Sequence, residues 1–374
     1  MGFSDYRGNS EVVEALRGML ARDRLPHSLI FAGPSGVGKY TLALMLARAI
    51  HCVDNIGLVG SDGPQDFCGH CFNCRLLDAV GDRRAAVAHA ELEREALSKR
   101  PREIPLIIQP HPDVTIFAPN GPLRLFQIEQ ARHLKQSLEF VATGKQRRIF
   151  ILPDADRMDA AAANSLLKSL EEPPADTVLI LTTSSDAALL PTIRSRCVPL
   201  WFSPVSTAEI ATFLNERGVG ENQKEREWRA AVTGGSPGAA LRLDRERYLI
   251  QRDALLSLLT AGATGPNFAE LLTQAQKLSG KDESLENLLE ILYILFQDIL
   301  HIESKANGEP LRNSDRPKTL VQVAHALGVE GLRKAAANLD MIERNLRRNV
   351  PARLSLEALA LGLAEAGSPS RRIS

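Results

Sequence analysis

The stretch that decides the fold reads LIFAGPSGVGKYTLALMLARAI and covers residues 29–50. Its first four residues are apolar, a glycine-rich turn follows, and the apolar residues after the turn have the spacing of a buried helix. In this context the motif G-x-x-x-x-G-K binds phosphate through the N–H groups of the loop and the lysine ammonium. A glycine-rich turn that binds nothing is the alternative. The candidate nucleotide-binding residues are Gly33, Pro34, Ser35, Gly36, Val37, Gly38, Lys39, Tyr40 and Thr41.

The residues around this phosphate-binding loop (P-loop) lack the groups that usually hold magnesium. Tyr40 follows the lysine where a serine or threonine hydroxyl is needed, and Thr41 comes one position, about 100° of helix rotation, too late. After the predicted strand at 149–152, Pro153 stands at the expected metal-binding aspartate, and Asp154 follows where a catalytic glutamate is expected. An alignment shifted by one residue would make Asp154 the ligand instead. Because phosphoryl transfer needs the metal, we expect that ATP, if bound, is not hydrolysed.

Short apolar runs recur along the first half of the chain and alternate with segments of helical periodicity. This alternation predicts an α/β fold with a parallel sheet covered by helices on both faces. The predicted strands are 29–32, 114–117, 149–152, 178–181 and 198–202, and two of the predicted helices are 125–141 and 159–172. The strand pattern ends at residue 203, and helical periodicity dominates the rest of the chain.

At 374 residues the chain exceeds the usual size of a single core, so we predict several domains. The first would be a nucleotide-binding-type domain that contains a cysteine-rich module and an inserted, solvated helical segment. A small helical unit, a larger all-helical domain and a mobile tail would follow. The predicted ranges are 1–203 for the first domain, 52–74 for the module, 78–109 for the insertion, and 204–247, 248–366 and 367–374 for the rest.

The charge balance excludes a global attraction to nucleic acid or membrane, because 45 Lys and Arg face 45 Asp and Glu. No apolar run approaches the roughly 20 residues needed to span a bilayer, and the N-terminal residues lack the apolar core of a signal peptide. We therefore expect a cytoplasmic protein with no membrane partner. Lys145, Arg147 and Arg148 are scattered basic residues of the kind that usually contact only solvent.

Four of the five cysteines lie close together in the sequence. Cys68, Cys71 and Cys74 have two-residue spacing, and Cys52 ends the helix that follows the P-loop and can supply a fourth thiolate. Four thiolates fit tetrahedral zinc, and His70 is a possible replacement ligand. Thiolates exclude magnesium and calcium, which leaves an iron–sulfur cluster as the competitor. With all four positions filled by protein, a zinc ion here would be structural.

Three motifs together resemble a known family. They read DADRM at 154–158, ANSLLKSLEEPP at 163–174 and LPTIRSRC at 190–197. In these motifs the chain is similar to the delta-prime subunits of the bacterial DNA polymerase III clamp loader, which belong to the AAA+ proteins. The resemblance extends from the N-terminal helix to GGSPG at 234–238 and more weakly to 349–359.

The resemblance implies an AAA+ core, a small helical lid and a C-terminal collar through which five subunits form a ring. It implies a non-catalytic subunit that assists ATP-driven loading of the sliding clamp onto primed DNA. The implied partners are the tau/gamma motor subunits and the delta subunit in a hetero-pentameric ring, the sliding clamp, and primer-template DNA through the complex. The whole assembly would be the polymerase III holoenzyme, a DNA-directed DNA polymerase and hence a nucleotidyltransferase.

The resemblance also assigns a role to Arg196, in the motif Ser-Arg-Cys. In the family this arginine is a finger that reaches the ATP site of the neighbouring motor subunit, where a guanidinium stabilises the developing phosphate charge. A structural salt bridge made by Arg196 or Arg194 is the alternative. Ala239 stands where active relatives carry an arginine that senses the nucleotide.

Two other functions stay open at this point. The chain could be a catalytically active clamp-loader ATPase of the tau/gamma type that tolerates Tyr40 and Pro153. It could also be a zinc-containing DNA-binding protein that forms no ring. Magnesium-dependent ATP turnover by the purified chain separates the first of these from a non-catalytic subunit.

Overall fold

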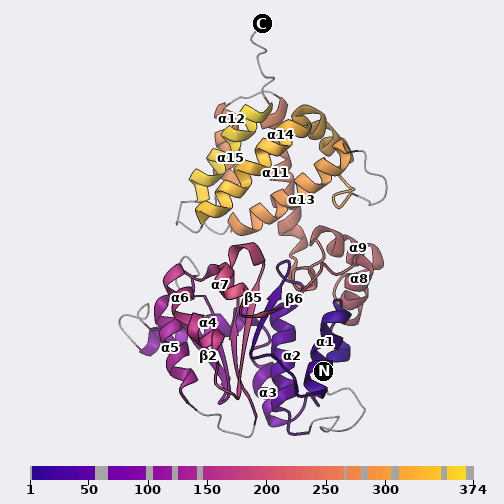
Figure 1. The fold of residues 1–374 in the computed structure, drawn as a ribbon. Coiled ribbons are helices and arrows are strands. Elements are labelled where there is room, and N and C mark those ends of the chain that lie inside the picture. The colour runs from indigo at the N-terminus through magenta and orange to yellow at the C-terminus, as the bar shows by residue number, and fades with distance from the viewer. Residues whose placement is uncertain are drawn as a thin grey trace. The chain divides into compact units, whose positions relative to one another are not determined.

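The computed structural model describes residues 2–54, 66–97, 104–119, 125–140, 146–264, 268–278, 285–304, 311–346 and 352–367. The chain forms two compact units, Met1–Leu241 and Arg242–Ser374 (Figure 1). The predicted tail at 367–374 lies outside the described residues except for its first residue. None of the described helices has both the length and the hydropathy needed to span a bilayer.

A six-stranded sheet in the order β2-β3-β4-β5-β1-β6 forms the centre of the first unit. Its strands are β1 (Ser28–Ala32), β2 (Ile107–His111), β3 (Val114–Phe117), β4 (Arg148–Leu152), β5 (Thr177–Thr183) and β6 (Val198–Trp201). Strands β1 and β3 to β6 pair in parallel, so the α/β prediction is confirmed. The prediction of a parallel sheet is wrong for the edge strand β2, which pairs antiparallel with β3. Only two residues separate β2 from β3, and a parallel pair needs a crossover of a dozen or more.

Helices cover both faces of this sheet, with α1 and α2 on one side and α5 and α6 on the other (Figure 1). Consecutive residues of β1 belong to different cores: Leu29 and Phe31 pack with α2, whereas Ile30 and Ala32 pack with α5 and α6. Such alternation is what a strand buried on both faces requires. The helices up to the last strand are α1 (Ser10–Ala21), α2 (Lys39–His51), α3 (Phe72–Asp78), α4 (Arg83–Leu97), α5 (Ile128–Leu138), α6 (Ala160–Glu171) and α7 (Pro191–Arg194).

Three short helices complete the first unit: α8 (Thr207–Glu216), α9 (Gln223–Val232) and α10 (Pro237–Arg242). They bury a small apolar core of their own, centred on Ile210, Leu214 and Ala230. The segment begins with a capping box, in which Ser206 accepts from the N–H of Glu209 and the Glu209 carboxylate accepts from the N–H of Ser206. The separation of a core at 1–203 from a lid at 204–247 stays a prediction.

All the secondary-structure elements that the structure describes in the second unit are helices, as predicted. Its helices are α11 (Arg245–Thr264), α12 (Phe268–Leu278), α13 (Leu285–Glu303), α14 (Pro317–Leu346), which breaks at Gly328, and α15 (Ala352–Gly367). Arg252 of α11 is 1% exposed and forms ion pairs with Asp253 at 2.8 Å and with Asp315, just before α14, at 2.7 Å. A buried arginine needs such partners, so this cluster fixes the start of α14 against α11.

Close packing around its backbone holds the P-loop, and a substitution of Gly36 tests this packing. Gly36 has φ +75°, and a Cβ there would lie 2.0 Å from Ser236 Oγ, which accepts from the N–H of Ala239. We predict that Gly36→Ala lowers the free energy of unfolding by about 2–3 kcal/mol, from left-handed backbone strain and a weakened helix cap. Denaturant unfolding measures the change.

Gly18→Ala is the matched control for this substitution. Gly18 lies in α1 with nothing within 4 Å of an added Cβ, so alanine should stabilise the helix by up to about 1 kcal/mol. Equal effects of the two substitutions would contradict the packing of the loop described above.

Candidate functional site

The P-loop connects β1 to α2, as the sequence predicts, and Lys39 is the first residue of the helix. Its ammonium donates to the carbonyl oxygens of Gly33 and Pro34, each at 2.6 Å, and the residue is only 8% exposed. Burial lowers the pKa of Lys39 to about 8, although the nearby carboxylates of Asp154 and Asp156 oppose the shift. The loop carbonyls therefore already bind the lysine ammonium that would otherwise contact the terminal phosphate of a nucleotide.

Three other segments of the first unit hold the loop from outside. The Tyr6 hydroxyl donates to the carbonyl of Val37 at 3.0 Å, and the N–H of Gly238 donates to the carbonyl of Gly36 at 3.3 Å. Gly33 lies so close to the backbone after β6 that an added Cβ would be 2.2 Å from the oxygen of Phe202. The shape of the loop thus depends on the N-terminus, the end of the sheet and the start of α10.

Two positions that serve catalysis in an active P-loop protein have other partners here: the magnesium-binding hydroxyl position after the lysine, and the catalytic-glutamate position after β4. The Tyr40 hydroxyl donates to the carbonyl of Val80 at 2.9 Å, and burial raises the pKa of this phenol. The Asp154 carboxylate forms an ion pair with Arg83 at 3.0 Å. Thr41 is exposed, as the helical rotation predicts. Because magnesium needs oxygen ligands that are free to coordinate, these residues do not fit it.

Sequence reasoning missed Arg83, and no local pattern could have found it. The guanidinium carbon of Arg83 lies 6.0 Å from the centre of the Tyr40 ring, in addition to the contact with Asp154. Arg83 is one of several charged residues in the segment predicted to be a solvated helix, and α4 does form there. Only the tertiary fold brings Arg83, the first residue of α4, to the P-loop.

Arg196 lies just after α7 at the surface of the first unit. Its Nε donates to the Glu171 carboxylate at 2.6 Å and its Nη1 donates to the carbonyl of Thr192 at 2.7 Å. Arg194 points to a different partner, Asp186, at 3.0 Å. Arg196, Ser195, Glu171 and Leu170 line an open depression. The salt bridge that was the alternative for Arg196 is therefore present, at a site that solvent reaches.

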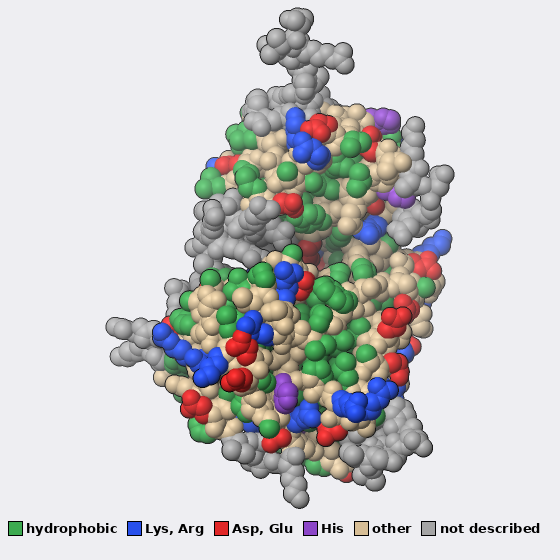
Figure 2. Space-filling model, viewed as in Figure 1, with side chains coloured by type: hydrophobic (Ala, Val, Ile, Leu, Met, Phe, Trp, Pro, Cys, Tyr) green, Lys and Arg blue, Asp and Glu red, His purple; other side chains and the backbone are tan. Residues whose placement is uncertain are grey.

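The scattered basic residues after α5 make internal contacts. Arg147 pairs with Asp23 at 3.0 Å, and buried Arg148 donates to the carbonyl of Phe140 at 2.7 Å, whereas Lys145 lies outside the described residues. On the face drawn in Figure 2, Lys and Arg side chains lie among Asp and Glu side chains. The described residues on this face therefore form no extended basic surface for a DNA backbone.

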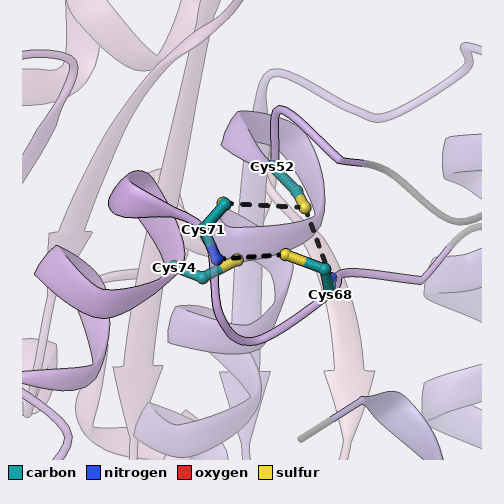
Figure 3. A group of neighbouring side chains, drawn as sticks. All are labelled: Cys52, Cys68, Cys71 and Cys74. Carbon is teal, nitrogen blue, oxygen red and sulfur yellow. Dashed lines mark hydrogen bonds between the residues drawn. The ribbon is translucent and has the colours of Figure 1, made fainter.

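The four clustered cysteines converge on one point, as Figure 3 shows. Their sulfur atoms all lie within 4.8 Å of one another, and those of Cys52 and Cys71 are 3.9 Å apart. Four ligands at the usual zinc–sulfur distance stand about 3.8 Å apart. The N–H of Cys68 donates to Cys52 Sγ at 3.3 Å and the N–H of Cys71 donates to Cys68 Sγ at 3.2 Å, which favours thiolates. The cluster could hold a metal ion.

The helices explain why these residues meet. Cys52 caps the C-terminus of α2, while Cys71 caps the N-terminus of α3 and Cys74 lies in its first turn. His70 is exposed, and its Nδ1 lies 2.9 Å from the Cys68 carbonyl, so the four sulfurs form a complete ligand set without it. Cys197 belongs instead to the core beside α6, where burial raises its pKa to about 12.

Fold and site together define a class: an α/β domain with a P-loop, in which Tyr40 and Asp154 have partners within the chain, followed by helical units. Residues 8–206 match the family described as DNA polymerase III, delta subunit, and residues 246–365 match its C-terminal family. The first match covers more than half of the chain. The chain belongs to the delta-prime family of DNA polymerase III clamp-loader subunits, as its motifs predict.

Individual relatives agree with this assignment. The DNA polymerase III subunit delta' of Bacillus subtilis (strain 168) is 27% identical over 363 residues, which cover 95% of each chain. The subunit delta' of Escherichia coli (strain K12) is 26% identical over 86% of this chain and 83% of its own length. A solved gamma subunit-related protein of Thermotoga maritima covers 94% of this chain and 100% of its own, at 16% identity and a TM-score of 0.40, too low to add to the assignment.

The cysteine cluster makes a prediction that needs no partner protein. We expect the purified chain to carry one tightly bound metal ion, and Cys74→Ser, at a buried ligand position, to lose it. Because a structural metal contributes to folding, the variant and the chelated wild type should both unfold at lower temperature. Elemental analysis of dialysed protein and thermal unfolding measure the two effects. Cys197→Ser is the control and should keep the metal; equal metal content in both variants would contradict the site.

Proposed function

We propose that this chain is a non-catalytic delta-prime subunit that assists ATP-driven loading of the sliding clamp onto primed DNA. The observation that carries the proposal is a folded P-loop in which the magnesium-binding hydroxyl position and the catalytic-glutamate position are held by internal contacts, Tyr40 with Val80 and Asp154 with Arg83. Phosphoryl transfer depends on the metal and on positioning together, so such a site does not turn over ATP. The family then places hydrolysis in neighbouring subunits.

The contribution of this chain to that hydrolysis is Arg196, acting as an arginine finger at the ATP site of the adjacent motor subunit. Its position supports the role, because the guanidinium lies at the surface in an open depression and is held by Glu171 and by the Thr192 carbonyl. In the ring the Arg196 guanidinium would leave the Glu171 carboxylate and bind the terminal phosphate of the ATP on the neighbouring subunit. A finger supplied in trans is worth about 10³ to 10⁵ in rate.

The proposed assembly is a hetero-pentameric ring with tau/gamma motor subunits and a delta subunit, joined through the C-terminal helical unit, within the cytoplasmic polymerase III holoenzyme. Relatives named as the delta' and as the tau subunit of DNA polymerase III occur together in Bacillus subtilis and in Escherichia coli. Primer-template DNA is reached through the complex. This agrees with Arg147 and Arg148, whose side chains make contacts inside the chain.

The proposed metal is zinc in a structural role. Four sulfur atoms within 4.8 Å of one another suit a single tetrahedral ion. An iron–sulfur cluster is larger and would need its cysteine ligands farther apart than this arrangement allows. All four positions are filled by protein, so no position remains for a catalytic water.

The finger is tested in a loader reconstituted with motor and delta subunits of the same organism. We expect Arg196→Ala to lower single-turnover ATP hydrolysis at the adjoining motor site by about 10³-fold or more, because transition-state charge is left uncompensated. Clamp loading on primed DNA should fall with it, while ring assembly, followed by gel filtration, should stay intact.

Arg194→Ala is the matched control, since Arg194 is two residues away and pairs with Asp186 instead. It should leave the rate at the adjoining site within about twofold of wild type, the effect of losing a surface ion pair. An Arg196→Ala loader that hydrolyses ATP at the rate of wild type would remove the finger assignment.

A further inference from the structure

Arg83 contacts both Tyr40, which stands at a magnesium-ligand position of the P-loop, and Asp154, which stands at the catalytic-glutamate position. Its Nη1 lies 3.0 Å from Asp154 Oδ2, and its guanidinium carbon lies 6.0 Å from the centre of the Tyr40 ring. Arg83 is the first residue of α4, in the segment 78–109, to which the proposed function gives no task. One positive charge from this segment therefore lies between the residue at a magnesium-ligand position and the residue at the catalytic-glutamate position.

We propose that Arg83 is a built-in cation that takes the place of magnesium at this P-loop and closes the site to magnesium-bound nucleotide. The inference deepens the proposed function and rests on it in one respect, that the site performs no hydrolysis. It gives the segment before β2 a role: to carry a positive charge to the loop.

The charges around the loop are balanced within the chain. Lys39 and Arg83 supply two positive charges, and Asp154 and Asp156 supply two negative charges that act on Lys39. The Asp156 carboxylate already accepts from the Thr183 hydroxyl at 2.9 Å and from the N–H of Ser184 at 3.3 Å. A divalent cation would enter beside a guanidinium, and like charges at close range repel. Magnesium nucleotide is therefore disfavoured even before its phosphates meet the loop.

The position of Arg83 is fixed by contacts of the chain just before it. Arg48, on α2, pairs with Asp78 at 2.7 Å, and the hydroxyl of Tyr40, the second residue of the same helix, donates to the carbonyl of Val80 at 2.9 Å. The Asp82 carboxylate then accepts from the N–H of Arg84 at 3.0 Å and so fixes the first turn of α4. The helix that begins at the P-loop thus anchors the segment that supplies the cation.

Nucleotide binding to the full-length chain, measured by calorimetry with ATP in magnesium or in EDTA, tests the inference. Tyr40→Thr restores the missing hydroxyl ligand and removes the contact with Val80, but the Arg48–Asp78 pair and the Asp82 cap still hold Arg83, so it should bind magnesium-ATP no better than wild type. Tyr40→Thr combined with Arg83→Gln should bind magnesium-ATP at least tenfold more tightly than wild type, and EDTA should abolish the gain. Tyr40→Thr combined with Arg83→Lys keeps the positive charge and should stay closed, which separates charge from packing.

Two results would overturn the inference. One is tight, magnesium-dependent binding by Tyr40→Thr alone; the other is a folded Tyr40→Thr/Arg83→Gln variant that binds no better than wild type. Arg84→Gln, which alters an exposed neighbour on the same helix, controls for loss of charge from α4 and should match wild type. Magnesium-dependent ATP turnover by the wild-type chain would instead contradict the proposed function, so the two failures are distinguishable.

Discussion

The structure of the first unit depends on the hydrogen bonds between the Lys39 ammonium and the carbonyls of Gly33 and Pro34. A buried ammonium needs partners, and the loop provides them from its own backbone. This closes the P-loop into a compact turn that β1 enters and α2 leaves. The same loop receives hydrogen bonds from Tyr6 and Gly238, so the ends of the first unit meet on it. A motif that elsewhere surrounds a nucleotide serves here as a packing centre.

Helix α2 begins in the P-loop and connects it to the rest of the first unit. Its first turn directs Tyr40 to the insertion, and Arg48 holds Asp78 of the same region. At its C-terminus the His51 ring packs 4.5 Å from His111 of β2, centre to centre, and Cys52 joins the cysteine cluster. The predicted metal module, the insertion and the antiparallel edge strand are therefore attached to one helix, whose position the P-loop sets.

Sequence patterns predict the parallel strands because they read as apolar runs; β1 and β4 are buried at every position, and the edge strand β6 is apolar although it is mostly exposed. Strand β2 reads IIQPH, and its proline and polar residues hide it, although proline is tolerated in an edge strand such as this one. The cysteine cluster was predictable from spacing alone. The ion pair of Arg83 with Asp154 was not, because it joins two ordinary surface residues far apart in the chain through the tertiary fold.

Two arginine–carboxylate pairs in the first unit differ in what surrounds them, and this difference separates their roles. Arg83 lies over the Tyr40 ring and pairs with Asp154, and the backbone before Arg83 is tied to α2. Arg196 and Glu171 are similarly exposed (29% and 46%, against 37% and 34% for Arg83 and Asp154), but they line an open depression at the surface. A surface ion pair contributes only about 0–1 kcal/mol, so Glu171 can yield Arg196 to a more highly charged phosphate at little cost. Arg83 is anchored, as a cation that replaces a metal must be. Arg196 can change partners, as an arginine finger for a neighbouring subunit must.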